Sequence, residues 1–416
     1  MAAMITKAAF LDSEVNYCTD YNTINASEIN VAESLQYRTP MVIYTAIVLP
    51  IILVTGFLDN ALFLIVIQRI ENMKNVTNAY LASLAVSDIA FLIFVVVHKL
   101  WKIIGSPEVV IDDSCLGSVG CVIMFVGSST SYFASLCFIT LVAWERRQAV
   151  RCPHLVGKNR FHNLTKSLKM ILFSWVVSFL LATSFIPSFI VFKKVCIIWP
   201  DEDTFQLFPS DVYLCSSINK AFEDYTHIAQ ALPFFFAMAV NIFLYFDIMR
   251  GLRESADRVQ SFDSLANASS RKRDESRVLN QTIKMLIING LTFFALLGPF
   301  EILSVCLLFD GWTEGALIST SSVEYRTIAW VVRTLSYLNA VINPIIYTVF
   351  SSRYRNAFNE TIREIYYGII PSRYRGTAGR RGRPISTTFV NNSAGTNDWN
   401  DNTRSMDVLE TQDTKL

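Results

Sequence analysis

The stretch LVAWERRQAVR, residues 141–151, passes directly from apolar side chains to the charged residues Glu145, Arg146 and Arg147. A helix needs about 20 apolar residues, at about 1.5 Å rise per residue, to cross the hydrocarbon core of a bilayer. The residues before Glu145 supply that length. The stretch therefore indicates the end of a membrane span and raises the question of what the charges do there.

The composition supports a membrane environment. Of 416 residues, 52% are hydrophobic and 17% are charged, and the mean hydropathy is +0.36. This is too apolar for an ordinary soluble protein. The net charge of +1 argues against nucleic acid as a partner, because proteins that bind polyphosphates carry a clear basic excess.

Seven apolar stretches have the length of a span. They lie at about 40–67, 78–101, 119–145, 168–192, 224–249, 282–309 and 325–350. The sequence therefore predicts an all-α membrane protein, a seven-transmembrane helix bundle with a short amphipathic eighth helix. Its predicted parts are an extracellular N-terminal tail (1–39), the bundle (40–350), an amphipathic membrane-surface helix (351–370) and a disordered cytoplasmic tail (371–416).

Charges between the spans predict the orientation. Lys and Arg collect after spans one, three, five and seven, whereas Asp and Glu collect on the other side. Short cytoplasmic loops carry the basic excess in membrane proteins. We therefore expect the N-terminus outside and the C-terminus inside. Asn25 begins the sequon Asn25-Ala26-Ser27 on the outer side and is either glycosylated or an unmodified loop residue.

No enzyme motif is present in the sequence. It lacks a Gly-rich phosphate loop, a His-Glu-x-x-His motif and a Gly-x-Ser-x-Gly motif, and its four histidines have no metal-ligand spacing. These absences argue against a membrane enzyme. Inside the spans, polar residues are expensive and are therefore candidates for function. They include Asp88 in span two and Asn339, Asn343 and Pro344 in span seven.

The order of several landmarks resembles the rhodopsin-like G-protein-coupled receptors over about residues 40–360. The landmarks are Asn60, LAVSD in span two, WERRQAV followed by Cys152-Pro153, Trp175, Pro233, Pro299 and NPIIY in span seven. The resemblance implies a receptor in the plasma membrane that activates a heterotrimeric G protein. A small transporter or proton-coupled channel built around Asp88 is the alternative from another class, but inverted repeats are not evident.

The resemblance also implies roles for individual residues. Glu145 would pair with Arg146 at the cytoplasmic mouth of span three, and Asn343, Pro344 and Tyr347 would form a switch in span seven. Asp88, Ser135, Asn339 and Asn343 would line a polar pocket that holds a sodium ion as an allosteric ligand, with Asp88 as the metal ligand. Leu136, Pro233 and Phe293 would transmit ligand binding by packing. Two departures from the family are Arg147, where an aromatic residue is usual, and Leu297, where the family has an aromatic toggle.

Exclusions favour a peptide as the ligand. Span seven contains no Lys for a retinal Schiff base, and Ser128 stands where an amine receptor needs Asp. A non-peptide small ligand remains the alternative. The expected ligand-binding residues are Lys99, Ser128, Tyr132, Glu301, Arg333 and Tyr337. Glu301 and Arg333 form either an internal ion pair or a contact pair for the ligand. The acidic outer face suggests that the peptide is basic.

Residues 195–200, VCIIWP, and the later DVYLC predict a hairpin whose first strand carries Cys196. By resemblance to peptide receptors, we expect a disulfide between Cys121 and Cys196, and a second between Cys115 and Cys215. The exchanged pairing Cys121–Cys215 is the alternative, because sequence does not fix connectivity.

The general appearance of WERRQAVRCPH and NPIIYTVFSSRYRNAF resembles invertebrate neuropeptide receptors of the FMRFamide or myoinhibitory-peptide kind. Residues 351–369 have apolar side chains at helical spacing, which suits a helix on membrane lipid. Ser386, Thr387 and Thr388 are candidate phosphosites for arrestin recruitment. The terminal Thr414-Lys415-Leu416 is a candidate PDZ ligand.

Overall fold

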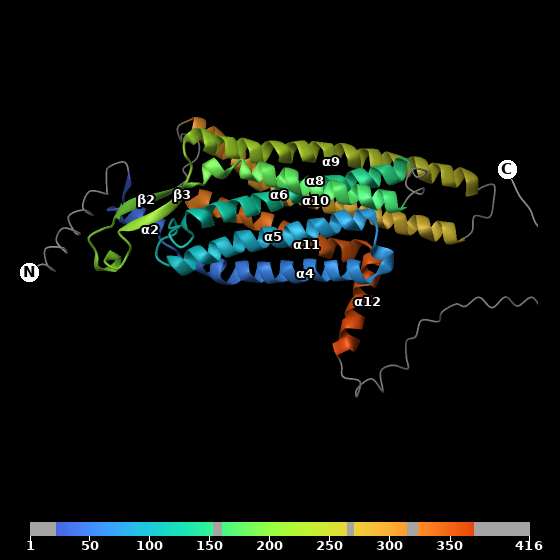
Figure 1. Cartoon of the computed structure of the whole chain (residues 1–416), viewed down its shortest axis with the longest axis horizontal. Helices are drawn as coiled ribbons and strands as arrows, with labels where there is room; N and C mark the ends of the chain where they lie inside the picture. Colours follow the sequence, from blue (N-terminus) through green and yellow to red (C-terminus); the bar gives the residue numbers. More distant parts are fainter. Residues whose placement is uncertain (1–21, 153–159, 264–269, 314–322, 370–416) are drawn as a thin grey trace, which may run out of the picture. The chain divides into compact units, whose positions relative to one another are not determined.

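The structure, a computed structural model, describes residues 22–152, 160–263, 270–313 and 323–369. Its main part is a bundle of long helices that lie side by side (Figure 1). These helices are α4 (Leu49–Arg69), α5 (Val76–Gly105), α6 (Gly117–Arg151), α8 (Arg160–Thr183), α9 (Lys220–Asp263), α10 (Ser270–Trp312) and α11 (Val323–Phe350). A short helix α3 (Thr39–Ile43) and a π-helical turn (Tyr44–Val48) lead into α4.

The helices have the length and composition of membrane spans. Among the described residues, six helical segments are long and apolar enough to cross a membrane. The seventh long helix, α11, falls outside this set because its interior includes Arg333, Asn339 and Asn343. Large apolar side chains such as Leu172, Phe173 and Phe236 point outward at 62–73% exposure. Lipid is the solvent that such a surface requires, so the chain is a multi-pass membrane protein.

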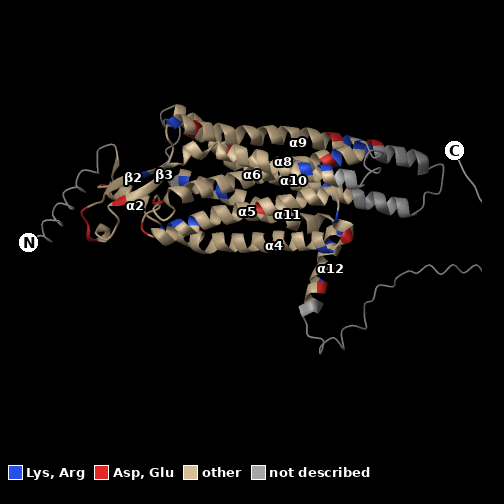
Figure 2. Cartoon of the chain, viewed as in Figure 1, with Lys and Arg blue, Asp and Glu red and all other residues tan. Residues whose placement is uncertain are grey.

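Charged residues are sparse in the middle of the bundle (Figure 2). The interior is instead filled by aromatic and aliphatic side chains. Phe63, Phe138, Phe293 and Tyr347 are each at most 1% exposed and belong to one cluster shared by several helices. This cluster separates the two ends of the bundle.

One end of the bundle carries a small sheet, and we call it the hairpin end. The sheet has the order β1 (Thr23–Asn25), β2 (Val191–Ile198), β3 (Asp211–Ser216); β1 and β2 are parallel, and β2 and β3 form the predicted hairpin. Helix α2 (Ile29–Leu35) packs with the sheet around a second apolar core that includes Ala32, Ile197 and Val212. We did not foresee this structure within residues 1–39, because its strand and helix are too short to give a periodic pattern.

The opposite end carries α12 (Ser352–Ile369), which turns away from the bundle after Ser351 (Figure 1). Tyr354, Ala357 and Phe358 are buried on one face of α12, and Arg353 and Arg355 are exposed. The predicted amphipathic helix is therefore present. Burial raises the pKa of Tyr354 to about 12, so its hydroxyl stays protonated and donates to Asn78 Oδ1.

Two boundaries differ from the sequence-based expectation. Helix α8 ends at Thr183 rather than near 192, because Ile186–Ser188 forms a 3₁₀ turn and Val191 already begins β2. Helices α9 and α10 extend beyond the predicted spans 224–249 and 282–309, since α9 continues to Asp263 and α10 begins at Ser270. The added turns carry many charged side chains, so they fall outside the apolar stretches.

The disulfide at the hairpin end is Cys121–Cys215, so the favoured pairing Cys121–Cys196 is wrong and the alternative is confirmed. Strand register explains the difference: Cys215 pairs with Phe192 near the start of β2, whereas Cys196 lies about 13 Å further along that strand. Cys196 is also disulfide-bonded, but not to Cys121. The expected Cys115–Cys215 bond is absent. Cys115 is a free thiol, and burial raises its pKa.

Candidate ligand-binding site

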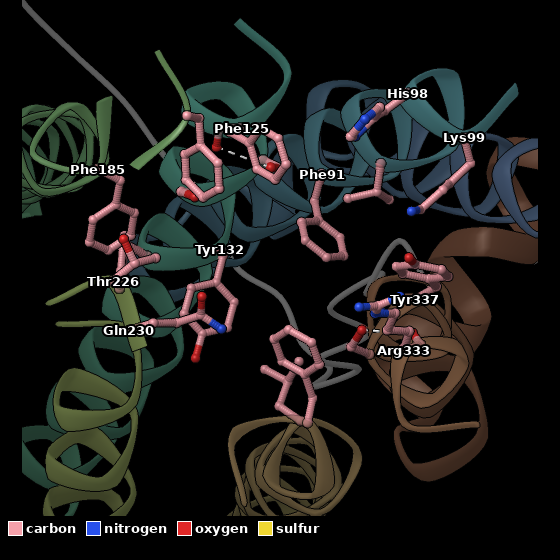
Figure 3. Close-up of a pocket in the computed structure, with 18 residues that line it drawn as sticks. Phe91, His98, Lys99, Phe125, Tyr132, Phe185, Thr226, Gln230, Arg333 and Tyr337 are labelled. Carbon is pink, nitrogen blue, oxygen red and sulfur yellow. Dashed lines mark hydrogen bonds between the residues drawn. The ribbon is translucent and has the colours of Figure 1, made fainter. Parts of the chain in front are cut away.

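A cavity of about 310 Å³ opens between the helices at the hairpin end (Figure 3). Its wall is mainly aromatic and apolar, with a few polar groups. Its lining residues are Phe91, Val95, His98, Lys99, Phe125, Ser128, Ser129, Tyr132, Phe133, Phe185, Phe189, Thr226, Gln230, Leu297, Phe300, Arg333, Ser336 and Tyr337. A deep pocket of this kind, with few converging polar groups, is typical of a ligand site.

Five of the six expected ligand-binding residues line this cavity. They are Lys99, Ser128, Tyr132, Arg333 and Tyr337, and Figure 3 shows Lys99 and Arg333 on facing helices. The other lining residues of α5 and α6 lie at the same helical spacing as these expected residues.

The phase is visible in α5 and α6. Phe91, Val95 and His98 share a face with Lys99 on α5, and Phe125 shares a face with Ser128 and Tyr132 on α6. The 3.6-residue period could have identified these lining positions.

Glu301 is the exception among the expected residues. It is 0% exposed and does not line the cavity. Its Oε1 accepts hydrogen bonds from the Tyr132 hydroxyl at 2.7 Å and from Gln230 Nε2 at 3.1 Å. The internal ion pair Glu301–Arg333 that we considered is therefore wrong. Tyr132 and Gln230 occupy the carboxylate from α6 and α9, so Glu301 connects three helices beneath the cavity.

A second cavity, of about 560 Å³, lies above the first one, under the sheet and α2. It is lined by residues of the α2–α3 segment, including Ser34 and Arg38, by Ile111 and Leu214, and by the top of α11. Lys99 and Arg333 line both cavities. These two side chains therefore lie between the two spaces.

In the middle of the bundle, the expected polar pocket is assembled around Asp88, which is 2% exposed. Asp88 Oδ1 accepts from the Ser135 hydroxyl at 3.2 Å, and Oδ2 accepts from Asn343 Nδ2 at 2.7 Å. Asn339 is also buried, and its Oδ1 has no hydrogen-bond partner among the described residues. The structure thus brings Asp88, Ser135 and Asn343 into direct contact.

The end opposite the hairpin is closed by ion pairs, and we call it the Arg146 end. Arg146 Nε lies 2.9 Å from Glu145 Oε2, and the Thr77 hydroxyl donates to the same oxygen at 2.7 Å. The expected pair is present and is held by α5. It lies near Tyr354 of α12, so three helices meet here.

Arg147, the departure from the family pattern, has its own partner. Its Nε lies 2.5 Å from Asp247 Oδ2 on α9, and Arg151 Nη2 lies 2.7 Å from Asp247 Oδ1. Arg151 also pairs with Glu254 at 2.7 Å. These contacts tie α6 to α9 at the Arg146 end. The sequence shows these charged residues but does not reveal which of them pair, because the partners are about a hundred residues apart.

Between the two ends lie the expected transmission residues. Leu136 and Phe293 are buried in the same cluster as Leu297, Phe234 and Tyr347. Pro233 lies within α9 beside Phe234 and is only partly buried. Pro344 lies within α11, next to Asn343. Leu297 lines the ligand cavity and also belongs to this cluster, so it connects the two directly.

Comparison with known proteins agrees with this geometry. The sequence profile of the 7 transmembrane receptor (rhodopsin family) matches residues 59–347. The chain is 28% identical over 330 residues to Neuromedin-U receptor 2 of Mus musculus, covering 77% of this chain and 75% of that protein. It is 26% identical over 361 residues to the neuromedin U receptor homolog nmur-2 of Caenorhabditis elegans, covering 80% and 85% of the two chains.

A third relative is the thyrotropin-releasing hormone receptor of Bos taurus, which is 24% identical over 353 residues, 79% of each chain. The profile match covers well over half of the chain and includes Asn60, Asp88, Arg146 and the Pro344 segment. The landmarks lie where the fold places a ligand cavity, a polar centre and a closed opposite end. The chain therefore belongs to the rhodopsin family of seven-transmembrane receptors.

Proposed function

We propose that this chain is a receptor for an extracellular neuropeptide and that it activates a heterotrimeric G protein. The observation that carries the proposal is the pair of adjacent cavities at the hairpin end, about 310 and 560 Å³. The inner cavity alone has the size of a small-ligand pocket, and the two together offer room for an extended peptide end. The relatives named as neuromedin and thyrotropin-releasing hormone receptors support the same ligand class.

The mechanism follows from the contacts. A ligand in the inner cavity touches Tyr132 and Leu297, which link it to Glu301 and to the apolar cluster. Repacking there shifts α10 relative to α6 and so weakens the Arg146 end, where Glu145 holds Arg146. Packed interfaces of this kind change between discrete arrangements, so a small shift is transmitted.

The test is a calcium and cyclic-AMP assay in cells that express the receptor, screened against a neuropeptide library. We expect at least one peptide to give a saturable response that cells without the receptor lack. Transport of a solute through the protein, with no peptide response, would overturn the proposal.

We propose that the receptor lies in the plasma membrane. In the proposed orientation the hairpin end is outside the cell and the Arg146 end is in the cytoplasm. The disulfide Cys121–Cys215 and the exposed Asn25 of the sequon suit an oxidising outer compartment. Epitope tags on the two termini, detected before and after permeabilisation, test it. An N-terminal tag that requires permeabilisation contradicts the orientation, and a glycosidase-sensitive mass shift that Asn25→Gln removes supports glycosylation.

We also propose that the central pocket binds a sodium ion. Asp88, Ser135 and Asn339 offer hard oxygen ligands of the kind that such cations prefer. The buried Asn339 Oδ1 without a partner supports the fit, because buried oxygens are normally satisfied. Bound there, the ion would supply a positive charge that holds the surrounding helices in the resting arrangement.

Finer proposals concern the sub-family and further partners. The ligand class by resemblance is of the FMRFamide or myoinhibitory kind, and both peptides belong in the library screen. Arrestin would bind through Ser386, Thr387 and Thr388, and a PDZ protein through Thr414-Lys415-Leu416. These segments lie outside the described residues. Phosphosite alanine variants and removal of the last three residues test the two partners separately.

A further inference from the structure

The charged side chains that line the two cavities are all basic among the described residues. They are Arg38, Lys99, Lys102, Arg326 and Arg333, and neither wall includes an Asp or Glu. Glu301, the nearest expected acid, is buried behind Tyr132 and Gln230. This charge is opposite to that expected for a basic peptide, which the acids of the outer loops suggested.

Three of these cations already have partners within the protein. Lys102 Nζ lies 2.7 Å from Asp113 Oδ1, and Arg38 lies 3.7 Å from Glu33. Arg326 Nη1 donates to the Ser34 carbonyl at 3.2 Å. Lys102 thus joins α5 to the segment that follows it, and Arg326 joins α11 to α2. Arg38 pairs with α2 itself, so all three cations have partners inside the protein.

Lys99 and Arg333 differ from the other three. In the part of the chain that the structure describes, neither the ammonium of Lys99 nor the guanidinium of Arg333 has an ion pair or a side-chain hydrogen bond. The two groups come from α5 and α11 and are close enough to repel each other. Figure 3 shows both side chains directed into the space between their helices. Like charges held together in this way favour a counter-ion between them.

The position of Lys99 and Arg333 indicates that a bound ligand would supply this counter-ion. Both residues line both cavities, so a group bound between them lies at the boundary of the outer and inner spaces. A carboxylate at this point would accept a charge-assisted hydrogen bond from Lys99 and a two-pronged one from Arg333. Below it, the aromatic wall with Phe91, Phe125 and Tyr337 suits an apolar side chain.

We propose that the ligand carries an acidic group that binds between Lys99 and Arg333, with an apolar residue beneath it. This inference rests on the proposed peptide-receptor function and names the charge of the peptide. The group is a carboxylate, either of an Asp or Glu side chain or of a free C-terminus. A peptide whose buried end carries only Lys or Arg is excluded, because it would add a third positive charge to the pair. The inference therefore counts against a ligand of the FMRFamide kind, whose amidated Arg-Phe end has no carboxylate.

The test is affinity selection, read by mass spectrometry, on the full-length receptor in lipid nanodiscs. Three pools of short synthetic peptides are offered: amidated peptides containing Asp or Glu, peptides with a free C-terminus but no acidic side chain, and amidated peptides with Lys or Arg and no acid. We expect recovery from the first or second pool at least about tenfold above the third, equivalent to about 1.4 kcal/mol. The first two pools distinguish the source of the carboxylate.

Variants locate the binding site. The double variant Lys99→Gln with Arg333→Gln should lose the excess of acidic peptides, and Lys99→Glu with Arg333→Glu should reverse it toward the third pool. The conservative changes Lys99→Arg and Arg333→Lys should retain it, which separates loss of charge from loss of fold. Lys193→Gln is the matched control, because this lysine of β2 lines neither cavity. A ligand-free melting temperature is recorded for each variant.

Several results would overturn the inference: equal recovery from all pools, preference for the third pool, or an acidic preference that survives the double Gln variant. Absence of recovery above empty nanodiscs counts against both the inference and the peptide-receptor proposal. Recovered peptides are then tested for G-protein activation in cells. Acidic peptides that bind but do not signal would contradict the proposed function alone, whereas signalling peptides without an acid would contradict the inference alone.

Discussion

The hairpin end and the Arg146 end handle their charges in opposite ways. At the Arg146 end, Arg146, Arg147 and Arg151 each lie within 2.9 Å of a carboxylate of the same chain. At the hairpin end, Lys99 and Arg333 line two adjacent cavities with no such partner among the described residues. One end is closed by internal ion pairs, and the other offers its charge to an external ligand.

The difference suggests that the two ends of the bundle have different roles, one in holding the resting arrangement and the other in binding a ligand. Arg147 and Arg151 attach α6 to α9 through Asp247, and Glu145, which pairs with Arg146 on α6, contacts Thr77 of α5. These attachments are reversible because the paired side chains are partly exposed to water. Lys99 and Arg333, which repel each other and have no counter-ion among the described residues, favour a ligand of the opposite charge. The apolar cluster between the ends, with Phe293 and Leu297, carries the change from one end to the other.

The largest expected effect comes from Arg146→Ala. It removes the guanidinium that Glu145 holds at rest, and we expect the response to an activating peptide to be abolished while peptide binding stays measurable. G-protein activation and radioligand binding are measured in the same membranes. Arg69→Ala, a half-exposed arginine at the end of α4, is the control and should signal normally. Unchanged signalling by Arg146→Ala would remove our assignment of its role.

The next effect distinguishes the cysteines of the hairpin end. Cys215→Ser opens a disulfide that closes a sequence separation of 94 residues, which costs about 4.7 kcal/mol in the chain-entropy treatment. We expect a strong fall in surface expression and in the melting temperature. Cys115→Ser should change neither greatly, because Cys115 is a free thiol. Equal loss in both variants would contradict the pairing.

A smaller effect concerns the closed end alone. Asp247→Asn removes the carboxylate that both Arg147 and Arg151 contact, so α6 and α9 lose a connection. We expect ligand-independent signalling to rise several-fold, measured as basal inositol phosphate at matched surface expression. Glu254→Gln removes only one outer contact of Arg151 and should raise it less. Lower basal activity in Asp247→Asn would show that these pairs support the active arrangement instead.

The smallest expected effect lies between the two ends. If sodium binds at Asp88, replacing choline with sodium should lower agonist affinity modestly in the wild type, by about two- to tenfold for a coupling of about 0.4–1.4 kcal/mol. Asp88→Asn should remove the sodium dependence while leaving some binding. Competition binding in the two salts at constant ionic strength measures it. A sodium effect that persists in Asp88→Asn would place the ion elsewhere.

Much of the fold was predictable because bilayer thickness imposes long apolar helices, and residues such as Asp88 and Asn343 are conspicuous inside them. Asp88, Ser135 and Asn343, which the family resemblance placed around one polar pocket, lie in contact, and Glu145 pairs with Arg146 as the same resemblance implied. Helical phase would also have found Phe91 and Phe125, because these positions depend on local periodicity alone.

Contacts between distant segments were less predictable. The Cys121–Cys215 bond depends on which cysteine of the hairpin lies next to the end of α6. The spacing of cysteines in the sequence does not reveal this. Glu301 has the right phase to face Arg333, yet Tyr132 and Gln230 from two other helices reach its carboxylate first. The small core of α2 and the sheet likewise depends on three segments that meet only in the folded chain.

The coupling between the two ends is tested most directly by a distance across the Arg146 end. Spin labels at the exposed Gln148 of α6 and Lys284 of α10, in receptor reconstituted into nanodiscs, report this distance by pulsed electron resonance. We predict that an activating peptide lengthens it, and that Lys99→Gln with Arg333→Gln abolishes the change at the same peptide concentration. A distance distribution that is identical with and without a peptide that binds and signals would contradict the proposed coupling.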